Sequence, residues 1–231
     1  MRWLAILFLF GLTAAAPPEK RYLITGFERV RIDGPYEVEI VRGPTQAVAS
    51  GDAKGLDRLD IHVDGTTLVI GAGAEGWNLA AGEAAVAPRV TLSTPVLRAV
   101  LINGGGRARI ADMRGSRIDL ALNGAGAIAV AALDAEELNA SITGNGTITL
   151  SGTARKARVR SNGSGGFDGS GFTANDAVLV SESAGNMRLG VRYTARVIAL
   201  GLGTVHLDGM PECTITGSGP VECAGKVIRP N

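Results

Sequence analysis

Arginine is the residue type whose pattern could do chemistry in this chain. Of the 23 basic residues, 19 are arginines and four are lysines. An arginine side chain binds carboxylates and phosphates through a planar fork of N–H donors. Five arginines at alternate positions are candidates for a cationic strip that binds an acidic glycan: Arg107, Arg109, Arg158, Arg160 and Arg188. The alternative is that they are solvated side chains on the outer face of strands.

Two cysteines, Cys213 and Cys223, are the second candidate group. An even number of cysteines in an oxidising compartment favours a disulfide, whereas in a reducing one they would be buried free thiols. The choice depends on whether the chain is exported.

Catalytic and metal-binding motifs are otherwise scarce. The sequence has no Gly-x-Ser-x-Gly elbow, HExxH, CxxC or P-loop pattern. We interpret His62 and His206 as solvated strand residues. The segment Gly163–Asp168 partly matches a calcium-binding nonapeptide, but as one imperfect copy. We therefore predict no enzymatic activity, no cofactor and no metal.

The acidic residues give little support to glycoside hydrolysis, which needs two carboxylates about 5–10 Å apart. Those expected to face outward in the second half are scattered along the chain: Asp112, Asp119, Asp168, Glu182, Asp208, Glu212 and Glu222. A carbohydrate-active enzyme remains the alternative function.

The first residues have the layout of a secretory signal. Arg2 precedes an uncharged apolar run, Trp3–Leu12, and small residues at Ala14–Ala16 precede Pro17. The run is too short for a membrane span, which needs about 20 apolar residues. We predict a signal peptide over residues 1–16, no transmembrane segment and a single mature domain over 17–231.

Composition bounds the fold and the partners. Glycine supplies 33 of 231 residues, aromatic residues are 4%, and the net charge is +1. This balance gives no reason to expect nucleic acid as a partner. A core rich in small aliphatic residues suggests thin repeated layers.

A Gly-x-Gly element recurs through the second half. Its seven copies centre on residues 105, 125, 145, 164, 184, 202 and 218, and the fifth has serine as its first residue. Of the 28 positions two and four residues outside these elements, 25 are apolar, and most interleaved positions are polar. Alternation with period two on both sides of a glycine corner predicts strand–corner–strand units.

A repeat of about twenty residues favours an all-β, right-handed parallel β-helix or β-solenoid, in which stacked rungs share one core. An antiparallel meander or sandwich is the alternative. Regular rungs are predicted over 97–224. Residues 22–96 also contain strand patterns, and they are predicted to form irregular first rungs that cap the solenoid. Residues 71–88 are interpreted as a loop.

The repeat also places the cysteines. Both fall at inward positions of the last rung, on opposite sides of the core. Packed sheets lie about 10 Å apart, whereas a disulfide needs Cα atoms within about 7 Å. We predict that this rung is pinched and that Cys213 and Cys223 form a disulfide.

The order of several segments resembles a known family. These segments are FERVRIDG (27–34), YEVEI (36–40), GTTLVI (65–70), VTLSTPVL (90–97) and INGGG (102–106). Together they resemble the auto-transporter adhesin head domain, or GIN domain, over residues 22–224. The resemblance implies an exported envelope protein with a right-handed β-helix-like fold and no catalytic residues.

These observations predict a periplasmic or extracellular, non-enzymatic binding module. Its expected partner is a polysaccharide or another envelope protein. A structural or assembly protein that pairs through the solenoid edge is a further alternative, and the outward Leu101, Ile198 and Leu200 could then belong to a contact patch.

Overall fold

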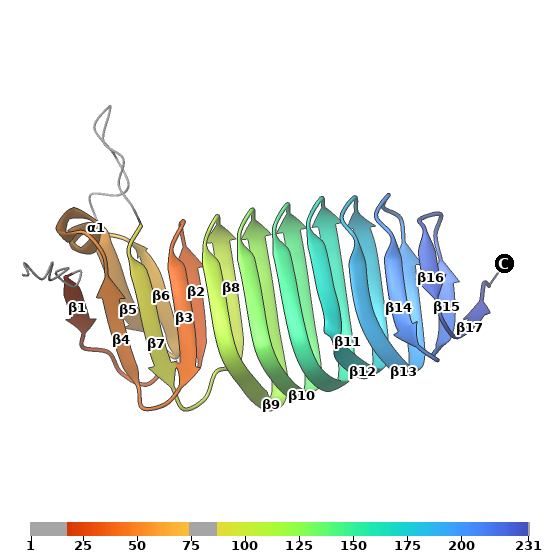
Figure 1. Cartoon of the computed structure of the whole chain (residues 1–231), viewed down its shortest axis with the longest axis horizontal. Coiled ribbons are helices and arrows are strands. Elements are labelled where there is room, and N and C mark those ends of the chain that lie inside the picture. Colours follow the sequence, from red (N-terminus) through yellow and green to blue (C-terminus); the bar gives the residue numbers. More distant parts are fainter. Residues whose placement is uncertain (1–17, 74–86, 231) are drawn as a thin grey trace, which may run out of the picture.

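The chain folds as a right-handed β-solenoid of about 6 turns, which confirms the predicted fold class. The computed structural model describes residues 18–73 and 87–230. In this part of the chain, 17 strands form one continuous hydrogen-bonded sheet wound around a single core (Figure 1). The predicted loop over 71–88 lies mostly outside the described residues.

The strands divide into an irregular N-terminal group and a regular series. The first group is β1 (Glu19–Tyr22), β2 (Arg29–Asp33), β3 (Glu37–Arg42), β4 (Gln46–Ser50), β5 (Leu59–Asp64), β6 (Thr67–Ala72) and β7 (Arg89–Thr94), with one helix, α1 (Ala53–Arg58). The series is β8 (Ala99–Gly104), β9 (Arg107–Gly124), β10 (Ala127–Gly144), β11 (Thr147–Gly163), β12 (Gly166–Ser183), β13 (Met187–Ala199), β14 (Val205–Gly209), β15 (Glu212–Thr216), β16 (Val221–Cys223) and β17 (Lys226–Ile228).

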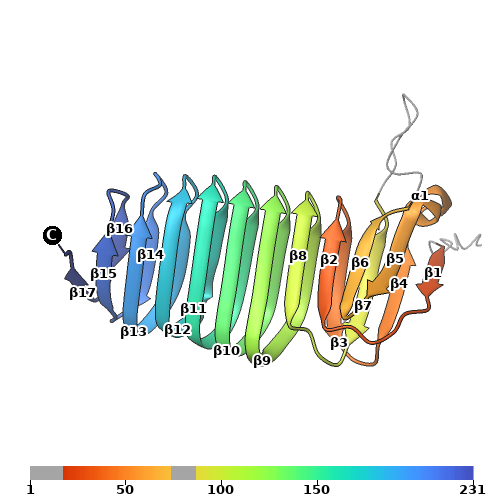
Figure 2. The same ribbon diagram turned by 180° about the vertical axis from the view of Figure 1, so that it is seen from behind.

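Each regular rung is one long strand that runs along both faces of the wound sheet. We call these two faces the front sheet and the back sheet. Strands β9 to β12 run from a glycine corner along the front sheet, turn through a bend, and return along the back sheet to the next corner. We call the two edges of the solenoid the corner edge and the bend edge, uppermost and lowermost in Figures 1 and 2. Neighbouring rungs pair in parallel, and each residue of β9 lies beside the residue of β10 that is 20 positions later in the sequence.

The core follows the predicted alternation. Of the 28 flanking positions, 26 are buried, and only Val221 and Cys223 are half-buried. These two lie on β16, which pairs with β14 on one side and with no described strand on the other.

Side-chain volume is balanced across the core under the corners. In one inward row, Ile142 is followed on the next rungs by Ser161, Ser181 and Ala199. In the facing row the larger Phe167 and Met187 occupy the corresponding rungs, and both are fully buried. Large residues opposite small ones keep the sheets evenly spaced, as close packing requires.

The buried serines differ in their hydrogen bonding. Ser183 Oγ donates to Gly165 O at 2.8 Å and accepts from Gly185 N at 3.0 Å. Ser161 Oγ donates to Gly165 O at 3.1 Å. Ser181 Oγ is buried and has no hydrogen-bond partner. An unpaired buried hydroxyl is destabilising, because folding removes its bonds to water.

The corners stack through backbone hydrogen bonds. Ala125 N donates to Gly104 O at 3.0 Å, and Asn145 N donates to Gly124 O at 2.9 Å. Gly124 has φ +124°, and a Cβ there would lie 2.5 Å from Gly104 O. Gly105, at the tip of the preceding corner, has open space around the same position. Glycine is thus required where rungs touch and dispensable at the tip.

The N-terminal rungs do not stack in chain order. Strand β2 lies between β6 and β8, and β3 lies between β7 and β9, so the first rung of the chain is inserted between two later ones. Antiparallel strands then cover the end: β4 pairs with β7, β1 with β4, and β5 with β6. This region caps the solenoid as predicted, but its spatial order could not be deduced from the period.

Replacing a stacked corner glycine tests this architecture. We expect Gly124→Ala to destabilise the protein by about 3 kcal/mol or more, because the methyl group is strained by the positive φ and collides with Gly104 O. Gly105→Ala is the matched control, with an expected change below about 0.5 kcal/mol. Thermal and urea unfolding followed by circular dichroism measure both. Equal effects would contradict the stacking role.

The serines provide a second test. Ser181→Ala is expected to stabilise the fold by up to about 1 kcal/mol, because it removes a buried hydroxyl without a partner. Ser183→Ala should instead destabilise it by about 1–2 kcal/mol, because it breaks two hydrogen bonds. The same unfolding assays decide, and a loss of stability in Ser181→Ala would show that its hydroxyl is satisfied.

Candidate binding face

The five candidate arginines lie on two different sheets. Arg107, Arg109 and Arg188 are on the front sheet, in segments that follow a glycine corner. Arg158 and Arg160 are on the back sheet, in the segment of β11 that leads to the next corner. The structure therefore does not bring them together as one strip.

Most of these arginines are paired with an acid on a neighbouring rung. Arg160 Nη2 lies 3.4 Å from Glu182 Oε2, and Arg158 pairs with Glu137. On the front sheet, Arg188 makes two hydrogen bonds to Asp208, of 2.8 and 3.2 Å. These pairs bridge successive rungs and so support their register.

The remaining two arginines lie beside acids of β3. Arg107 Nη1 lies 3.9 Å from Glu37 Oε1. Arg109 is opposite Glu39 in the register and makes no ion pair with a described residue.

The pKa values of the Glu182 and Asp208 carboxyl groups are both lowered. The hydrogen bond from Asn162 is the main cause that lowers the pKa of Glu182, and the charge of Arg160 adds to it. The hydrogen bond from Arg188 lowers the pKa of Asp208 despite partial desolvation, and Asp208 in turn raises the pKa of Arg188. Both directions favour the charged forms.

A shallow groove runs across the back sheet. It consists of two adjoining hollows of about 380 and 440 Å³ that share Arg158 and Val178. The first spans β9 to β12, with a floor that includes the small residues Ala121 and Ser141. The second continues from β11 to β15. The groove therefore follows the solenoid axis over successive rungs.

The groove is lined by charges of both signs around an apolar centre. Its cations are Lys156, Arg158, Arg160 and Arg196, and its acids are Asp119, Asp176 and Glu212. Val178 lies at the centre with 39% of its surface exposed. Arg196 makes no ion pair with a described residue, so its guanidinium is available to a ligand.

Sequence reasoning found Arg158 and Arg160 but missed the rest of the groove. Asp119, Asn139, Arg158, Val178 and Arg196 occupy equivalent positions on successive rungs. Reading one position across the repeats would have placed them in a row.

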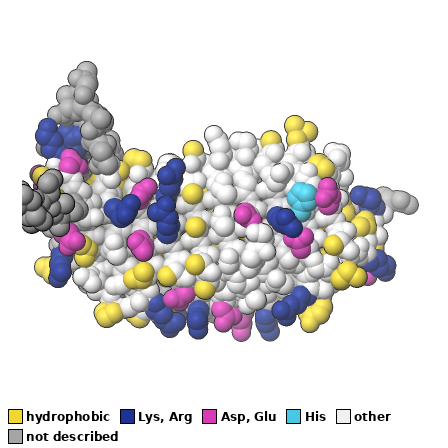
Figure 3. All heavy atoms as spheres, in the orientation of Figure 1, with side chains coloured by type: hydrophobic (Ala, Val, Ile, Leu, Met, Phe, Trp, Pro, Cys, Tyr) yellow, Lys and Arg dark blue, Asp and Glu magenta, His cyan; other side chains and the backbone are white. Residues whose placement is uncertain are grey.

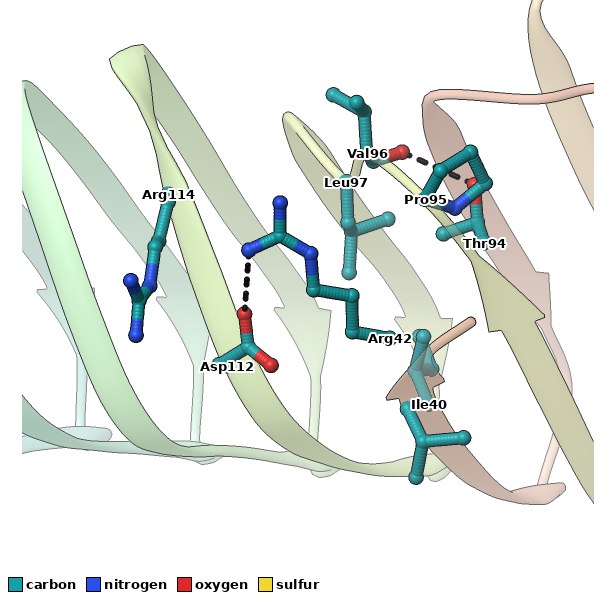
Figure 4. Close-up of a pocket in the computed structure, with 9 residues that line it drawn as sticks. Ile40, Arg42, Thr94, Pro95, Val96, Leu97, Asp112 and Arg114 are labelled. Atoms are coloured by element: carbon teal, nitrogen blue, oxygen red, sulfur yellow. Dashed lines mark hydrogen bonds and ion pairs between the residues drawn. The ribbon is translucent and has the colours of Figure 1, made fainter. Parts of the chain in front are cut away.

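A smaller hollow lies where the regular rungs begin (Figure 4). Arg42 from β3 reaches toward Asp112 of β9, with 3.8 Å between Nη1 and Oδ1, beside the segment Thr94–Leu97. Its volume is about 40 Å³. A water molecule needs at least about 10–15 Å³ of such space, so the hollow suits a few waters and not a sugar.

Polar residues at the corner edge form a partial ladder. Asn103 Nδ2 donates to Asp33 Oδ1 at 2.6 Å, and Asn123 Nδ2 donates to Asn103 Oδ1 at 3.1 Å. Asn162 instead donates to Glu182 at 2.9 Å. Thr143 takes the position between Asn123 and Asn162.

The two histidines are paired with acids on the surface. His62 Nδ1 lies 2.7 Å from Asp60 Oδ2, and His206 Nδ1 lies 2.9 Å from Glu222 Oε2. In the described part of the chain, no cluster of three or more His, Cys, Asp or Glu residues has a geometry that could hold a metal.

The disulfide between Cys213 and Cys223 is present. The two Cα atoms are 6.6 Å apart, which is well below the separation of two packed sheets and shows the expected pinching. Cys213 is fully buried and Cys223 is half-buried. The bond joins β15 to β16 across the open end of the solenoid.

Comparison with known proteins agrees with this architecture. Residues 26–211 match the family described as "Putative auto-transporter adhesin, head GIN domain", and the chain belongs to this family. This confirms the resemblance noted in the sequence. No curated protein matches the chain. No helix among the described residues is long and apolar enough to cross a membrane.

Several solved structures share the fold. A "putative adhesin" from Bacteroides fragilis superposes with a TM-score of 0.80 at 18% identity, covering 91% of this chain and 96% of that one. A "putative adhesin" from Parabacteroides merdae gives 0.62 at 15% identity, covering 94% and 98%. A "putative lipid binding protein" from Parabacteroides distasonis gives 0.56 at 15% identity, with the same coverage.

Removing the disulfide should loosen one end of the solenoid only. We expect the double variant Cys213→Ser, Cys223→Ser to lose up to about 2–3 kcal/mol of local stability in β14 to β17, because the terminal rungs lose a closed loop. Amide hydrogen exchange measures this, with β10 as the internal control. Unchanged protection in β14 and β15 would contradict the role of the bond.

Proposed function

We propose that this chain is an exported, non-enzymatic, adhesin-like module of the bacterial envelope that binds an extended acidic polysaccharide along the back groove. The observation that carries the proposal is the shape of this groove, which crosses successive rungs of a rigid sheet from β9 to β15. An extended polymer can contact many rungs at once, whereas a small metabolite would require an enclosed pocket.

The charges of the groove favour an anionic polymer. Four cations and three acids line it, and Arg196 has no acidic partner among the described residues. Guanidinium groups suit the carboxylates and phosphates of acidic polysaccharides. The family description and the neighbours described as adhesins support a binding role.

The arrangement of the acids supports a non-enzymatic role. Asp119, Glu182 and Glu212 lie on the back sheet, whereas Asp168, Asp208 and Glu222 lie on the front sheet. A glycosidase needs one carboxylic acid with a raised pKa. The pKa values of Glu182 and Asp208 are lowered, which is the wrong direction for either group to act as that general acid.

Export is supported by the N-terminal sequence and by the disulfide. Arg2, the apolar run after it and Ala14–Ala16 form a secretory signal pattern. A structural disulfide such as Cys213–Cys223 is typical of proteins that fold in an oxidising compartment.

The open end of the solenoid is poorly suited to strand addition. Its last strands, β16 and β17, have three residues each and are flanked by Pro220 and Pro230. Short edge strands and nearby prolines are common devices against edge pairing. These features favour the binding module over an assembly that extends through this end.

The proposal is tested by measuring binding to immobilised acidic and neutral polysaccharides at low salt. The double variant Arg158→Gln, Arg196→Gln is expected to bind the acidic polymer about tenfold more weakly or worse, because two cations of the groove are lost. Arg107→Gln, Arg109→Gln removes the same charge from the front sheet and should bind like the parent protein. The polymer should keep its chain length.

Other outcomes would contradict the proposal in different ways. Shortening of the polymer would identify an enzyme. Equal losses in both variants would show that only net charge matters, and no binding to any acidic polysaccharide would reject this ligand class.

A further inference from the structure

The bend edge carries charges whose sign alternates from rung to rung. Counting only the residues of each bend, the net charge is +2 for residues 114–117, −3 for 134–137, +2 for 153–156, −1 for 173–176, +1 for 190–194 and −1 for 209–212. These bends belong to β9, β10, β11, β12, β13 and the β14–β15 connection. Charged side chains of both signs also lie along the lower edge in Figure 3.

Alternation of this kind avoids like charges on stacked rungs. However, many of these charges are not paired with another residue of the same chain. Six of the charged residues make no ion pair or side-chain hydrogen bond with a described residue: Arg114, Asp134, Glu136, Arg155, Lys156 and Arg192. Two large apolar side chains are also exposed on this edge, Tyr193 at 61% and Met210 at 81%. The edge therefore presents unpaired charges and apolar surface to a partner.

The spacing of the charges restricts what that partner can be. Rungs stack about 4.8 Å apart, so charges of one sign repeat at about 10 Å along a straight edge. The edge of another β-solenoid has the same rung spacing and can therefore carry charges at the same intervals. The partner that the charges match rung by rung is therefore a second copy of this chain.

Orientation follows from the order of signs. If two copies lie antiparallel, bend edge to bend edge, a two-fold axis between β11 and β12 sets the β11 bend against the β12 bend. It also sets β10 against β13, and β9 against the β14–β15 connection. In each of these three pairings a positive bend meets a negative one. In a parallel, in-register arrangement every bend would instead meet one of its own sign.

We propose that the protein forms an antiparallel homodimer through the bend edge. The interface is isologous, because each contact occurs twice about the two-fold axis. Complementary charges determine its orientation, and Tyr193 and Met210 supply its apolar contacts. Because the contacts are largely electrostatic, the dimer weakens as salt concentration rises.

The dimer has a consequence that rests on the proposed function. The two-fold axis is parallel to the direction that separates the front and back sheets, so the back sheets of both copies face the same side. Two grooves would then meet one polymer or one surface together, and avidity would exceed the affinity of a single groove.

A charge swap between two rungs tests the interface. Glu136 lies on the β10 bend and Arg192 on the β13 bend. Across the proposed axis, Glu136 of one copy therefore faces Arg192 of the other copy. We expect Glu136→Arg and Arg192→Glu each to weaken dimerisation about tenfold or more at low salt. The double variant restores the opposite-sign pairing and should dimerise like the parent protein. Sedimentation equilibrium of the whole protein, with no ligand present, measures the dissociation constant.

The swap separates contacts between copies from contacts within one copy. Within a chain the two residues are three rungs apart, about 14 Å, and any interaction between them is present in both monomer and dimer, so it cancels from the dissociation constant. Rescue by the double variant therefore reports an intermolecular contact. Arg109→Glu, an equal charge change on the front sheet, is the matched control and should leave dimerisation unchanged.

Two results would overturn the proposal. One is a parent protein that stays monomeric at low salt and high concentration. The other is a dimer in which the double variant is no better than either single variant, because the contact would then lie elsewhere. Neither result bears on polysaccharide binding, which is measured separately through Arg158 and Arg196.

Discussion

The close stacking of backbone at the glycine corners is the constraint on which the rest of the structure depends. Each corner carbonyl accepts a hydrogen bond from the next rung, as Gly104 O does from Ala125 N. At this approach a Cβ on Gly124 would collide with that carbonyl. Because the corners must coincide, every rung starts in the same register, and equivalent side chains form continuous rows.

The rows explain both the interior and the surface. Inside, a small residue such as Ser181 on one side of the core is balanced by a larger one, Met187, on the other. Outside, charged side chains at equivalent positions of neighbouring rungs lie close together, and they would repel one another if their signs were the same. Acids and bases therefore alternate or pair between rungs, as in Arg160 with Glu182. The same register that fills the core therefore produces the polar surface available for binding.

The layout of this surface fits the binding role proposed above. Functional groups on a flat solenoid are distributed along rows, whereas catalysis needs several groups to converge on one atom. A groove that follows the rungs, together with an edge of alternating charge, favours extended and repetitive partners. The chain shares this scaffold with solved structures described as putative adhesins.

The sequence by itself determined the solenoid, its regular rungs, the inward residues and the disulfide, because a fixed period and alternation are local properties that stacking only repeats. Only the tertiary structure decided how distant segments meet. It inserted the rung of β2 and β3 between later strands, and it divided the five arginines between two sheets. It also joined Asp119, Val178 and Arg196 into one groove. Such contacts depend on which rungs become neighbours and on which side of a bend a residue falls, and neither is set by local alternation.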